Sequence, residues 1–333
     1  MRWLATAQTG SGLAPSDRRS KLRLAMAAAS RRTPGSVSQL SARTLLLTVV
    51  TLFAFASNSV LCRFALREGE IDAGSFTAVR LISGAVFLWL ILVLPARIRS
   101  PLPSGGEGLG VRGSGSWPMA FFLFAYAACF SFAYLSLSAA TGGLILFGCV
   151  QATMIAYGLV KGERPTWLEW SGLAVAVSGL VYLFLPRLDA PSLVGGLLMA
   201  LAGVSWGFYS VLGRGVPDPS LATAGNFVRS VPFALAMGLI GLIGRMELHA
   251  STMGVLLAVV SGAVTSGLGY VVWYHALKGL TATRAAVVQL AVPVIVALGG
   301  VAFIGEELTL SLVLSGALIL GGIAIVVAGK SKR

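Results

Sequence analysis

Two short stretches, VKGERPT at residues 160–166 and FIGEELT at residues 303–309, decide how this chain folds. Each places a Gly-Glu pair at the end of a long apolar run. The two glutamates, Glu163 and Glu306, lie in different halves of the chain. A repeated ending of this kind predicts that the chain contains two copies of one structural unit.

The composition indicates a membrane protein. Hydrophobic residues make up 56% of the 333 residues, charged residues only 11%, and the mean hydropathy is +0.86. Soluble domains average about 25% charged residues. The net charge of +13 does not indicate nucleic acid, because the basic residues lie between apolar runs and form no single patch. We therefore expect a lipid bilayer as partner and no nucleic acid.

The cysteines and histidines give no sign of a metal or redox site. Cys62, Cys129 and Cys149 all lie in apolar runs without a CxxC pair, and the two histidines are far from them in sequence. Small buried hydrophobes are the expected role of such cysteines. We expect no metal and no cofactor.

Apolar windows long enough to cross a bilayer recur ten times. A hydrocarbon core about 30 Å thick needs about 20 helical residues. The sequence therefore predicts an all-α membrane protein with ten transmembrane helices. The expected spans lie near residues 44–66, 74–95, 118–138, 142–161, 167–185, 192–213, 221–243, 252–277, 283–304 and 309–329.

The basic residues predict the orientation. With a cytoplasmic N-terminus and ten spans, 19 of the 25 lysines and arginines lie on the cytoplasmic side. Such an excess is typical of cytoplasmic segments. We expect both termini in the cytoplasm and a multi-pass location in the bacterial inner membrane.

Two stretches fall outside the spans. Residues 1–42 are rich in Arg, Ser and Ala, and we expect a disordered basic extension. The alternatives are an organellar transit peptide and translation that starts further downstream, for example at Met26. Residues 100–116, SPLPSGGEGLGVRGSGS, are expected to form a flexible cytoplasmic linker after the second span.

Further matches extend the repeat beyond Gly-Glu. Residues 55–58 align with residues 206–209, Arg80 with Arg229, and AYLSL at 133–137 with WYHAL at 273–277. We expect a first five-helix repeat over residues 43–189 and a second over residues 190–333. Because five is odd, the second repeat enters the membrane from the opposite face. Inverted repeats of this kind are typical of secondary transporters.

These residues resemble the EamA-type transporters of the drug/metabolite transporter superfamily. The resemblance covers about residues 43–329. It is carried by the region of Arg63 and Arg80, Gly162-Glu163-Arg164, Trp206-Gly207, Pro293 and Gly305-Glu306-Glu307. It implies ten spans in two five-helix repeats and the export, or less often the uptake, of small metabolites such as amino acids.

The chain departs from the family pattern at three places. The first repeat has Phe55-Ala56 where Trp-Gly is usual, and Arg63 where a lysine is frequent. It also has Val150 at the position that corresponds to Pro293. Since proline removes a backbone hydrogen bond and kinks helices, we expect the ninth span to bend where the fourth stays straight.

Polar and aromatic residues inside the spans are the candidate binding residues. They must find hydrogen bonds within the protein, either as interhelical contacts or as a lining for a substrate. A cavity of amides and aromatic rings suits a small zwitterion or an apolar-tailed metabolite. The candidates are Asn58, Gln151, Trp206, Tyr209, Tyr270 and Gln289.

Charged residues in or beside the spans are candidates for charge recognition or gating. Arg80 and Arg229 either bind a substrate carboxylate or extend to the membrane interface. Glu163 and Glu306 end their spans and either gate the protein or pair with a basic residue nearby. No Asp or Glu lies deep in an expected span, which disfavours proton exchange on a buried carboxylate.

We predict a secondary transporter that exports a small metabolite by alternating access at a midplane cavity. Uptake or exchange of a sugar-linked or vitamin-like substrate is the alternative, and an intramembrane enzyme is a further one. The chain has no GxxxxGK[ST], HExxH or GxSxG motif, so we expect no catalytic residue. The expected partner is the small-molecule substrate, and the sequence leaves open whether two copies of the chain form a homodimer.

The first prediction follows from the cavity. Gln151→Ala or Tyr209→Ala should lower transport in reconstituted vesicles while the protein still inserts into the membrane, because each change removes part of the lining. Transport and membrane expression are measured together. Unaltered flux in both variants would take these residues out of the binding site.

Overall fold

The computed structural model describes residues 41–93, 115–187, 192–245, 247–299, 301–302 and 307–329. Within these ranges the chain is helical and forms no strand, only an isolated bridge between Ile71 and Ala250. Residues 1–40 of the expected extension, residues 100–114 of the expected linker, and Glu306 lie outside the described residues.

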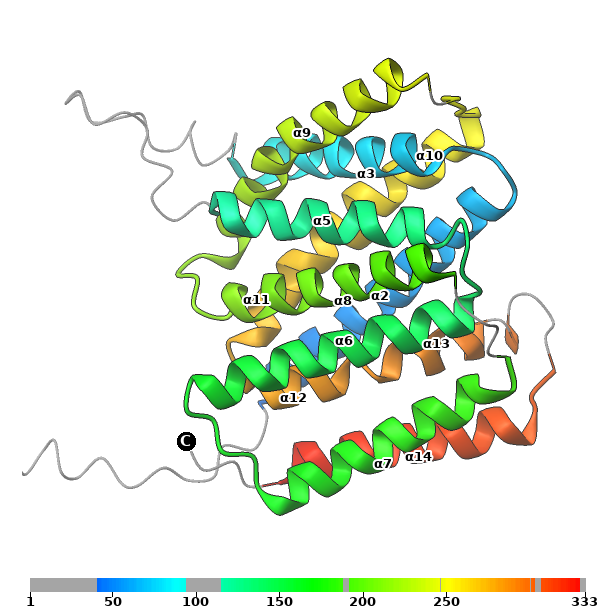
Figure 1. Cartoon of the computed structure of the whole chain (residues 1–333). Coiled ribbons are helices and arrows are strands. Elements are labelled where there is room, and N and C mark those ends of the chain that lie inside the picture. Colours follow the sequence, from blue (N-terminus) through cyan, green and yellow to red (C-terminus); the bar gives the residue numbers. More distant parts are fainter. Residues whose placement is uncertain are drawn as a thin grey trace, which may run out of the picture. The chain divides into compact units, whose positions relative to one another are not determined.

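In the part of the chain that the structure describes, ten helical segments follow one another (Figure 1). Within the described residues, nine are long and apolar enough to cross a membrane, and α5 is an apolar helix of shorter length. This confirms an all-α membrane protein. The segments are α2 (Ala42–Arg67); α3 (Ala73–Leu88) with η1 (Trp89–Val93); α5 (Trp117–Ala133); α6 (Ala139–Val160); α7 (Trp167–Phe184) with η2 (Leu185–Arg187); α8 (Leu193–Gly213); α9 (Pro219–Ile243); α10 (Thr252–Val260), η3 (Ser261–Leu268) and α11 (Gly269–Leu277); α12 (Ala282–Val288) and α13 (Ala291–Gly299); and α14 (Leu310–Ala328).

The start of each segment is fixed by a side-chain cap. In all ten, a Ser, Thr or Asp oxygen accepts a hydrogen bond from a backbone N–H of the first turn, which would otherwise have no partner. Thr166 goes further and forms a capping box with Glu169. The ten caps are Ser41, Asp72, Ser116, Ser138, Thr166, Ser192, Asp218, Ser251, Thr281 and Thr309.

The third span is shorter than expected. We expected residues 118–138, but α5 ends at Ala133 and residues 134–136 form a turn before the Ser138 cap of α6. The matched stretch in the second half stays helical to Leu277. The aligned stretches 133–137 and 273–277 therefore differ in local structure.

Two segments of the second half are interrupted. The eighth span passes through the π-helix η3, and the ninth breaks at Gln289 and Leu290, between α12 and α13. Pro293 has no N–H for the Gln289 carbonyl, which instead accepts from Val292 N at 3.0 Å. In contrast, α6 continues through Val150 to Val160. The expected difference between the fourth and ninth spans is confirmed.

The loops gather at two ends of the helical region (Figure 1). The left end in that view holds the turns α6–α7, α8–α9 and α11–α12, and we call it the Glu163 end. The right end holds the turns α2–α3 and α9–α10, and we call it the Asp72 end. Helix α3 packs against α9, and α7 against α14, each pair running antiparallel.

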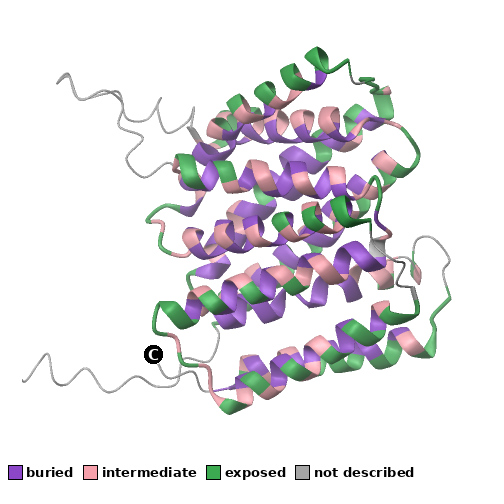
Figure 2. Ribbon diagram, in the orientation of Figure 1, coloured by how far each residue is buried: buried purple, intermediate pink, exposed green. Residues whose placement is uncertain are grey.

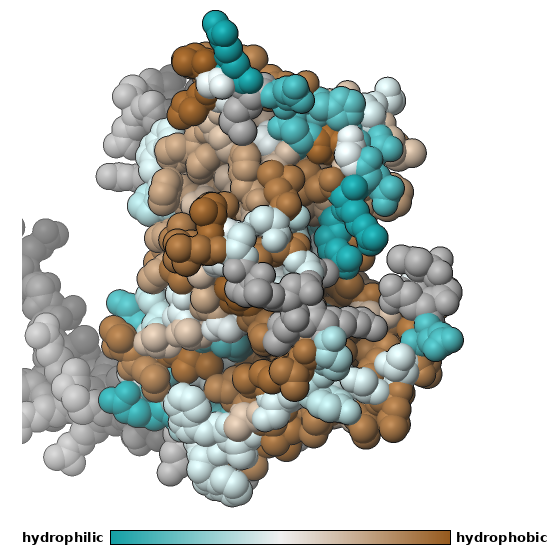
Figure 3. Space-filling view, turned by 45° about the vertical axis from the view of Figure 1, so that its right-hand side comes forward, coloured by the Kyte–Doolittle hydropathy of each residue, from teal (hydrophilic) through white to brown (hydrophobic). Residues whose placement is uncertain are grey.

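Apolar side chains cover both the inside and the outside of the helices. Buried residues face neighbouring helices (Figure 2), while large hydrophobic residues such as Leu193, Ile243 and Leu310 are exposed. Hydrophobic residues also cover much of the face shown in Figure 3. An apolar outer surface of this kind is typical of contact with lipid.

Glycines bring α7 and α14 into backbone contact. A Cβ atom added at Gly322 would lie 2.5 Å from the Gly172 carbonyl oxygen, and one at Gly179 would lie 2.8 Å from Leu318 Cβ. Such close packing through small residues is a common way to join helices in membranes, where no hydrophobic driving force acts between them.

Gly322→Ala should therefore lower the thermal midpoint of the purified protein, because overpacking costs about 1–3 kcal/mol. The adjacent Gly321→Ala is a matched control, since a Cβ atom there meets nothing within 4 Å. That control should leave the midpoint unchanged or raise it, because alanine favours helix. Equal effects of the two changes on the midpoint would contradict the packing argument.

Candidate functional site

A cluster of buried aromatic rings lies where α2, α5, α8 and α11 meet. Trp206 on α8 is its centre, with ring centroids 5.1 Å from Phe55, 4.9 Å from Tyr126 and 4.8 Å from Tyr270. Tyr209, one turn further along α8, lies 5.7 Å from Trp206. Four helices therefore contribute rings to a single cluster.

Trp206 connects this cluster to the break in the ninth span. Its Nε1 donates to Gln289 Oε1 at 2.7 Å, and Gln289 Nε2 donates to the Ala285 carbonyl at 2.9 Å. Gln151 of α6 donates to the Ala286 carbonyl at 2.8 Å, while its Oε1 is buried without a hydrogen-bond partner. One predicted amide, Gln289, therefore lies at the helix break, and the other, Gln151, contacts α12 just before it and keeps a free acceptor.

A small cavity lies beside Trp206 and Gln289. Its volume is about 30 Å³, and Phe55, Ser59 and Tyr126 also line it, with apolar side chains of α6 and α13. A single water molecule needs about 10–15 Å³ of such space, so the cavity has room for very few waters. It is therefore too small for a metabolite in this conformation, and the helices would have to separate to admit one.

The π-helix η3 presents three hydroxyl groups to α2. Asn58 Oδ1 accepts from Ser261 at 2.7 Å and from Thr265 and Ser266 at 3.3 Å each. The Ser266 hydroxyl in turn accepts from Arg80 Nε at 2.9 Å. The network therefore joins α2, α3 and the eighth span through polar side chains.

Arg80 joins the hydroxyl network to the aromatic cluster. Its Nη2 donates to the Tyr270 hydroxyl at 2.7 Å, and its guanidinium carbon lies 5.5 Å from the centroid of the Tyr126 ring. Arg229 has a different environment, because it is half-buried and donates to Gly225 of its own helix at 3.1 Å. Arg80 thus contacts the aromatic cluster, whereas the hydrogen bond of Arg229 is to its own helix, α9.

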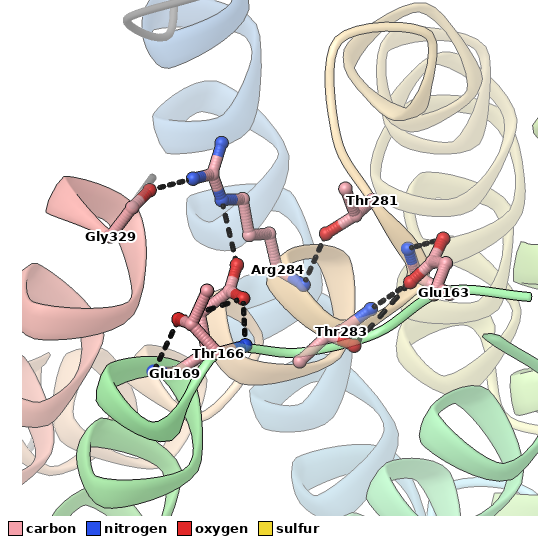
Figure 4. Close-up of polar contacts among 8 residues, drawn as sticks. Glu163, Thr166, Glu169, Thr281, Thr283, Arg284 and Gly329 are labelled. Carbon is pink, nitrogen blue, oxygen red and sulfur yellow. Dashed lines mark hydrogen bonds and ion pairs between the residues drawn. The ribbon is translucent and has the colours of Figure 1, made fainter. Parts of the chain in front are cut away.

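Glu163 ties three elements together at its end of the protein. Its Oε1 accepts from Arg214 Nη1 and from the backbone N–H of Ala282, both at 2.8 Å. The backbone N–H of Thr283 also donates to Glu163, at 3.3 Å (Figure 4). The carboxylate thereby links the α6–α7 loop to the end of α8 and to the start of α12.

A second ionic contact, which the sequence analysis did not single out, lies nearby. Glu169 of α7 and Arg284 of α12 are both buried, and Arg284 Nε lies 3.4 Å from Glu169 Oε1 (Figure 4). Arg284 also donates a hydrogen bond to the Gly329 carbonyl after α14. The spacing Thr166-x-x-Glu169 indicates a helix start, but it does not reveal the arginine partner. This pair holds α7, α12 and α14 together.

The opposite end has its own backbone contacts. Asp72 accepts from the backbone N–H groups of Ser75 at 2.9 Å and His249 at 3.0 Å. Partial burial acts to raise the pKa of Asp72, but these hydrogen bonds outweigh it and hold the pKa below its ordinary value. The carboxylate therefore stays ionised at neutral pH and keeps the α2–α3 and α9–α10 turns together.

A larger pocket opens beside these turns. Its volume is about 480 Å³, and it lies between the end of α2 and the α5–α6 turn. Arg63, Arg67, Tyr134 and Ser138 contribute polar groups to its lining. The Asp72 end therefore has a basic pocket, whereas the Glu163 end is joined by the carboxylate contacts.

The structure brings the six expected binding residues into one connected region. Trp206, Tyr209 and Tyr270 form ring contacts. Gln289 lies at the helix break and Gln151 contacts α12 just before it, while Asn58 reaches Tyr270 through Ser266 and Arg80. Sequence reasoning missed Tyr126 and the three hydroxyls of η3. The only signal was their polarity within apolar runs, which many residues share.

Comparison with known proteins assigns the family. The model of the EamA-like transporter family matches residues 193–328. The uncharacterized protein PA1977 of Pseudomonas aeruginosa is 47% identical over 87% of this chain and 96% of its own length. An uncharacterized transporter of Archaeoglobus fulgidus is 25% identical over 87% of this chain and 99% of its own length. A solved crystal structure with 20% identity has the same fold, with a TM-score of 0.69 over 87% of this chain and 98% of its own. The chain is therefore a multi-pass membrane protein that belongs to the EamA-like transporter family.

Proposed function

We propose that this protein is a secondary transporter that exports a small metabolite, such as an amino acid, across the bacterial inner membrane. The observation that carries the proposal is the hydrogen bond between Trp206 and Gln289. Both residues line the small cavity, and the bond joins the aromatic rings of four helices to the break in the ninth span. Discontinuous helices at the centre of a bundle are typical of transporter substrate sites.

Two inverted repeats, residues 43–189 and 190–333, would make alternating access possible at this site. Three observations support them. The expected counterparts α3 and α9 pack antiparallel, as do α7 and α14, and the aligned residues Phe55 and Trp206 contact each other at 5.1 Å. The family match over residues 193–328 also falls within the second proposed repeat.

The Glu163 end is proposed to face the cytoplasm, together with both termini. Among the described residues, this end carries Lys161, Arg164, Arg214, Lys278 and Arg284, which fits the excess of positive charge on cytoplasmic segments. The contacts of Glu163 would then close the cytoplasmic side in this conformation. Opening that side would require α12 to leave Glu163 and Arg214.

The direct test is flux through the purified protein in liposomes. Liposomes loaded with labelled amino acids should lose a subset of them faster than protein-free liposomes do, with and without a pH gradient. Trp206→Phe should lower that flux about tenfold, because it leaves the buried Gln289 oxygen without its donor at a cost of about 1–3 kcal/mol.

Trp117→Phe is the matched control, because Trp117 is 56% exposed at the start of α5. It should transport like the wild type. Flux of the wild type no faster than protein-free liposomes, for amino acids and then for other small metabolites, would reject the proposed function. Equal flux from Trp206→Phe and Trp117→Phe would reject the site.

Glu163→Gln should loosen the Glu163 end. The partly exposed pair with Arg214 contributes at most about 1 kcal/mol, and the carboxylate at the start of α12 contributes about 0.3–1 kcal/mol more. A cysteine placed at Ala282 should react several-fold faster with a water-soluble maleimide in this variant. Glu68→Gln, an exposed glutamate at the other end, is the control. Equal reaction rates in both would show that Glu163 does not hold this end closed.

A further inference from the structure

Arg80 is a buried cation that meets no counter-ion among the described residues. It is 1% exposed, and no described carboxylate lies within salt-bridge distance of it. Its Nε and Nη2 donate to neutral hydroxyls of Ser266 and Tyr270, while Nη1 has no hydrogen-bond partner. Arg80 therefore carries both an uncompensated charge and an unused donor.

Such a charge is costly in a membrane protein. An uncompensated charged side chain within a span costs several kcal/mol, and such residues usually lie on substrate or ion pathways. An uncharged polar side chain in place of Arg80 could also form hydrogen bonds to the Ser266 and Tyr270 hydroxyls, so these contacts alone do not require a charge. The charge itself is therefore explained better by a ligand than by packing.

The surroundings hold the guanidinium in a fixed position. Asn58 accepts hydrogen bonds from three hydroxyls of η3, one of which, Ser266, then accepts from Arg80. Gly262 of η3 lies directly against α3, since a Cβ atom there would be 2.1 Å from the Arg80 carbonyl oxygen. A planar guanidinium that is fixed in this way matches a carboxylate in two parallel hydrogen bonds.

The charge of the region limits the ligand to one negative charge. The buried charged side chains of the described residues are Arg80, Glu169 and Arg284, and the last two pair with each other near the Glu163 end. A phosphate dianion would therefore bring one charge that nothing neutralises. Arg63 and Arg67 in the pocket at the Asp72 end would attract anions from that side.

The aromatic cluster provides the place for the rest of the ligand. The Tyr126 ring contacts the guanidinium on one side and lines the cavity beside Trp206. We propose that Arg80 binds the carboxylate of a small organic acid with an apolar body, which the rings of Tyr126, Trp206 and Tyr270 contact. This inference rests on the proposed function and names its substrate class.

The test compares ligands that differ in one group. The probes are 3-phenylpropanoate, its amide 3-phenylpropanamide, the amine 3-phenylpropylamine and phenyl phosphate, added to the detergent-solubilised full chain at constant ionic strength. At about ten times its dissociation constant, 3-phenylpropanoate should raise the thermal midpoint by about 2 °C. The amide, the amine and phenyl phosphate should shift it less.

Variants locate the effect. Arg80→Met should abolish the carboxylate response, and Arg80→Lys should weaken it, because lysine lacks the planar fork. Ser266→Ala and Tyr270→Phe keep the charge but loosen its position, so they should reduce the response even if the Arg80 variants do not fold. Arg245→Gln, which removes an exposed arginine, should respond like the wild type.

A response to the amide, the amine or phenyl phosphate as large as that to the carboxylate would overturn the proposal. An absent carboxylate response in the wild type, or a full response in Arg80→Met, would overturn it as well. Flux in the liposome assay would still stand in those cases, for a substrate of another charge class. The failure of this inference is thus distinct from the failure of transport.

Discussion

Lipid offers no hydrogen bonds, and this constraint governs where the helices of this protein can be irregular. A free backbone group in hydrocarbon costs several kcal/mol. The break at Gln289 and the π-helix η3 lie in the interior, whereas the π-helix η1 at the end of the second span has the exposed side chains Leu90 and Ile91. Most residues of η3 and of the break are buried, and side chains from other helices contact them. The same places collect the polar side chains, so the irregular backbone and the candidate site coincide.

The two halves of the chain place similar polar residues in different surroundings. Arg80 is enclosed by η3 and α11, whereas Arg229 lies half-buried on α9. Gln289 lies at a helix break and accepts from Trp206, whereas Gln151 lies in a continuous helix and donates to the Ala286 carbonyl. The difference between Val150 and Pro293 accompanies this contrast, since α6 is continuous through Val150 whereas the ninth span breaks just before Pro293.

Much of the fold follows from the sequence, because spans are set by local hydropathy and their starts by Ser, Thr or Asp caps. Pro293 likewise predicts the break, since a missing N–H is a local property. The π-helix has no such marker. The end of α5 at Ala133 has none either, because the residues around it are as apolar as those of a continuing helix. The candidate residues of the site were recognisable by type. The partners of these residues could not be predicted, because they depend on how helices distant in the sequence are rotated against each other. The contact of Arg80 with Tyr270 and that of Glu169 with Arg284 are two examples.

The placement of Glu163 has a consequence for how α8 and α12 can move. One carboxylate accepts hydrogen bonds from both elements, so the start of α12 cannot leave the end of α8 without the loss of some of these bonds. A single side chain of the α6–α7 loop thus couples the positions of two helices that are far apart in the sequence.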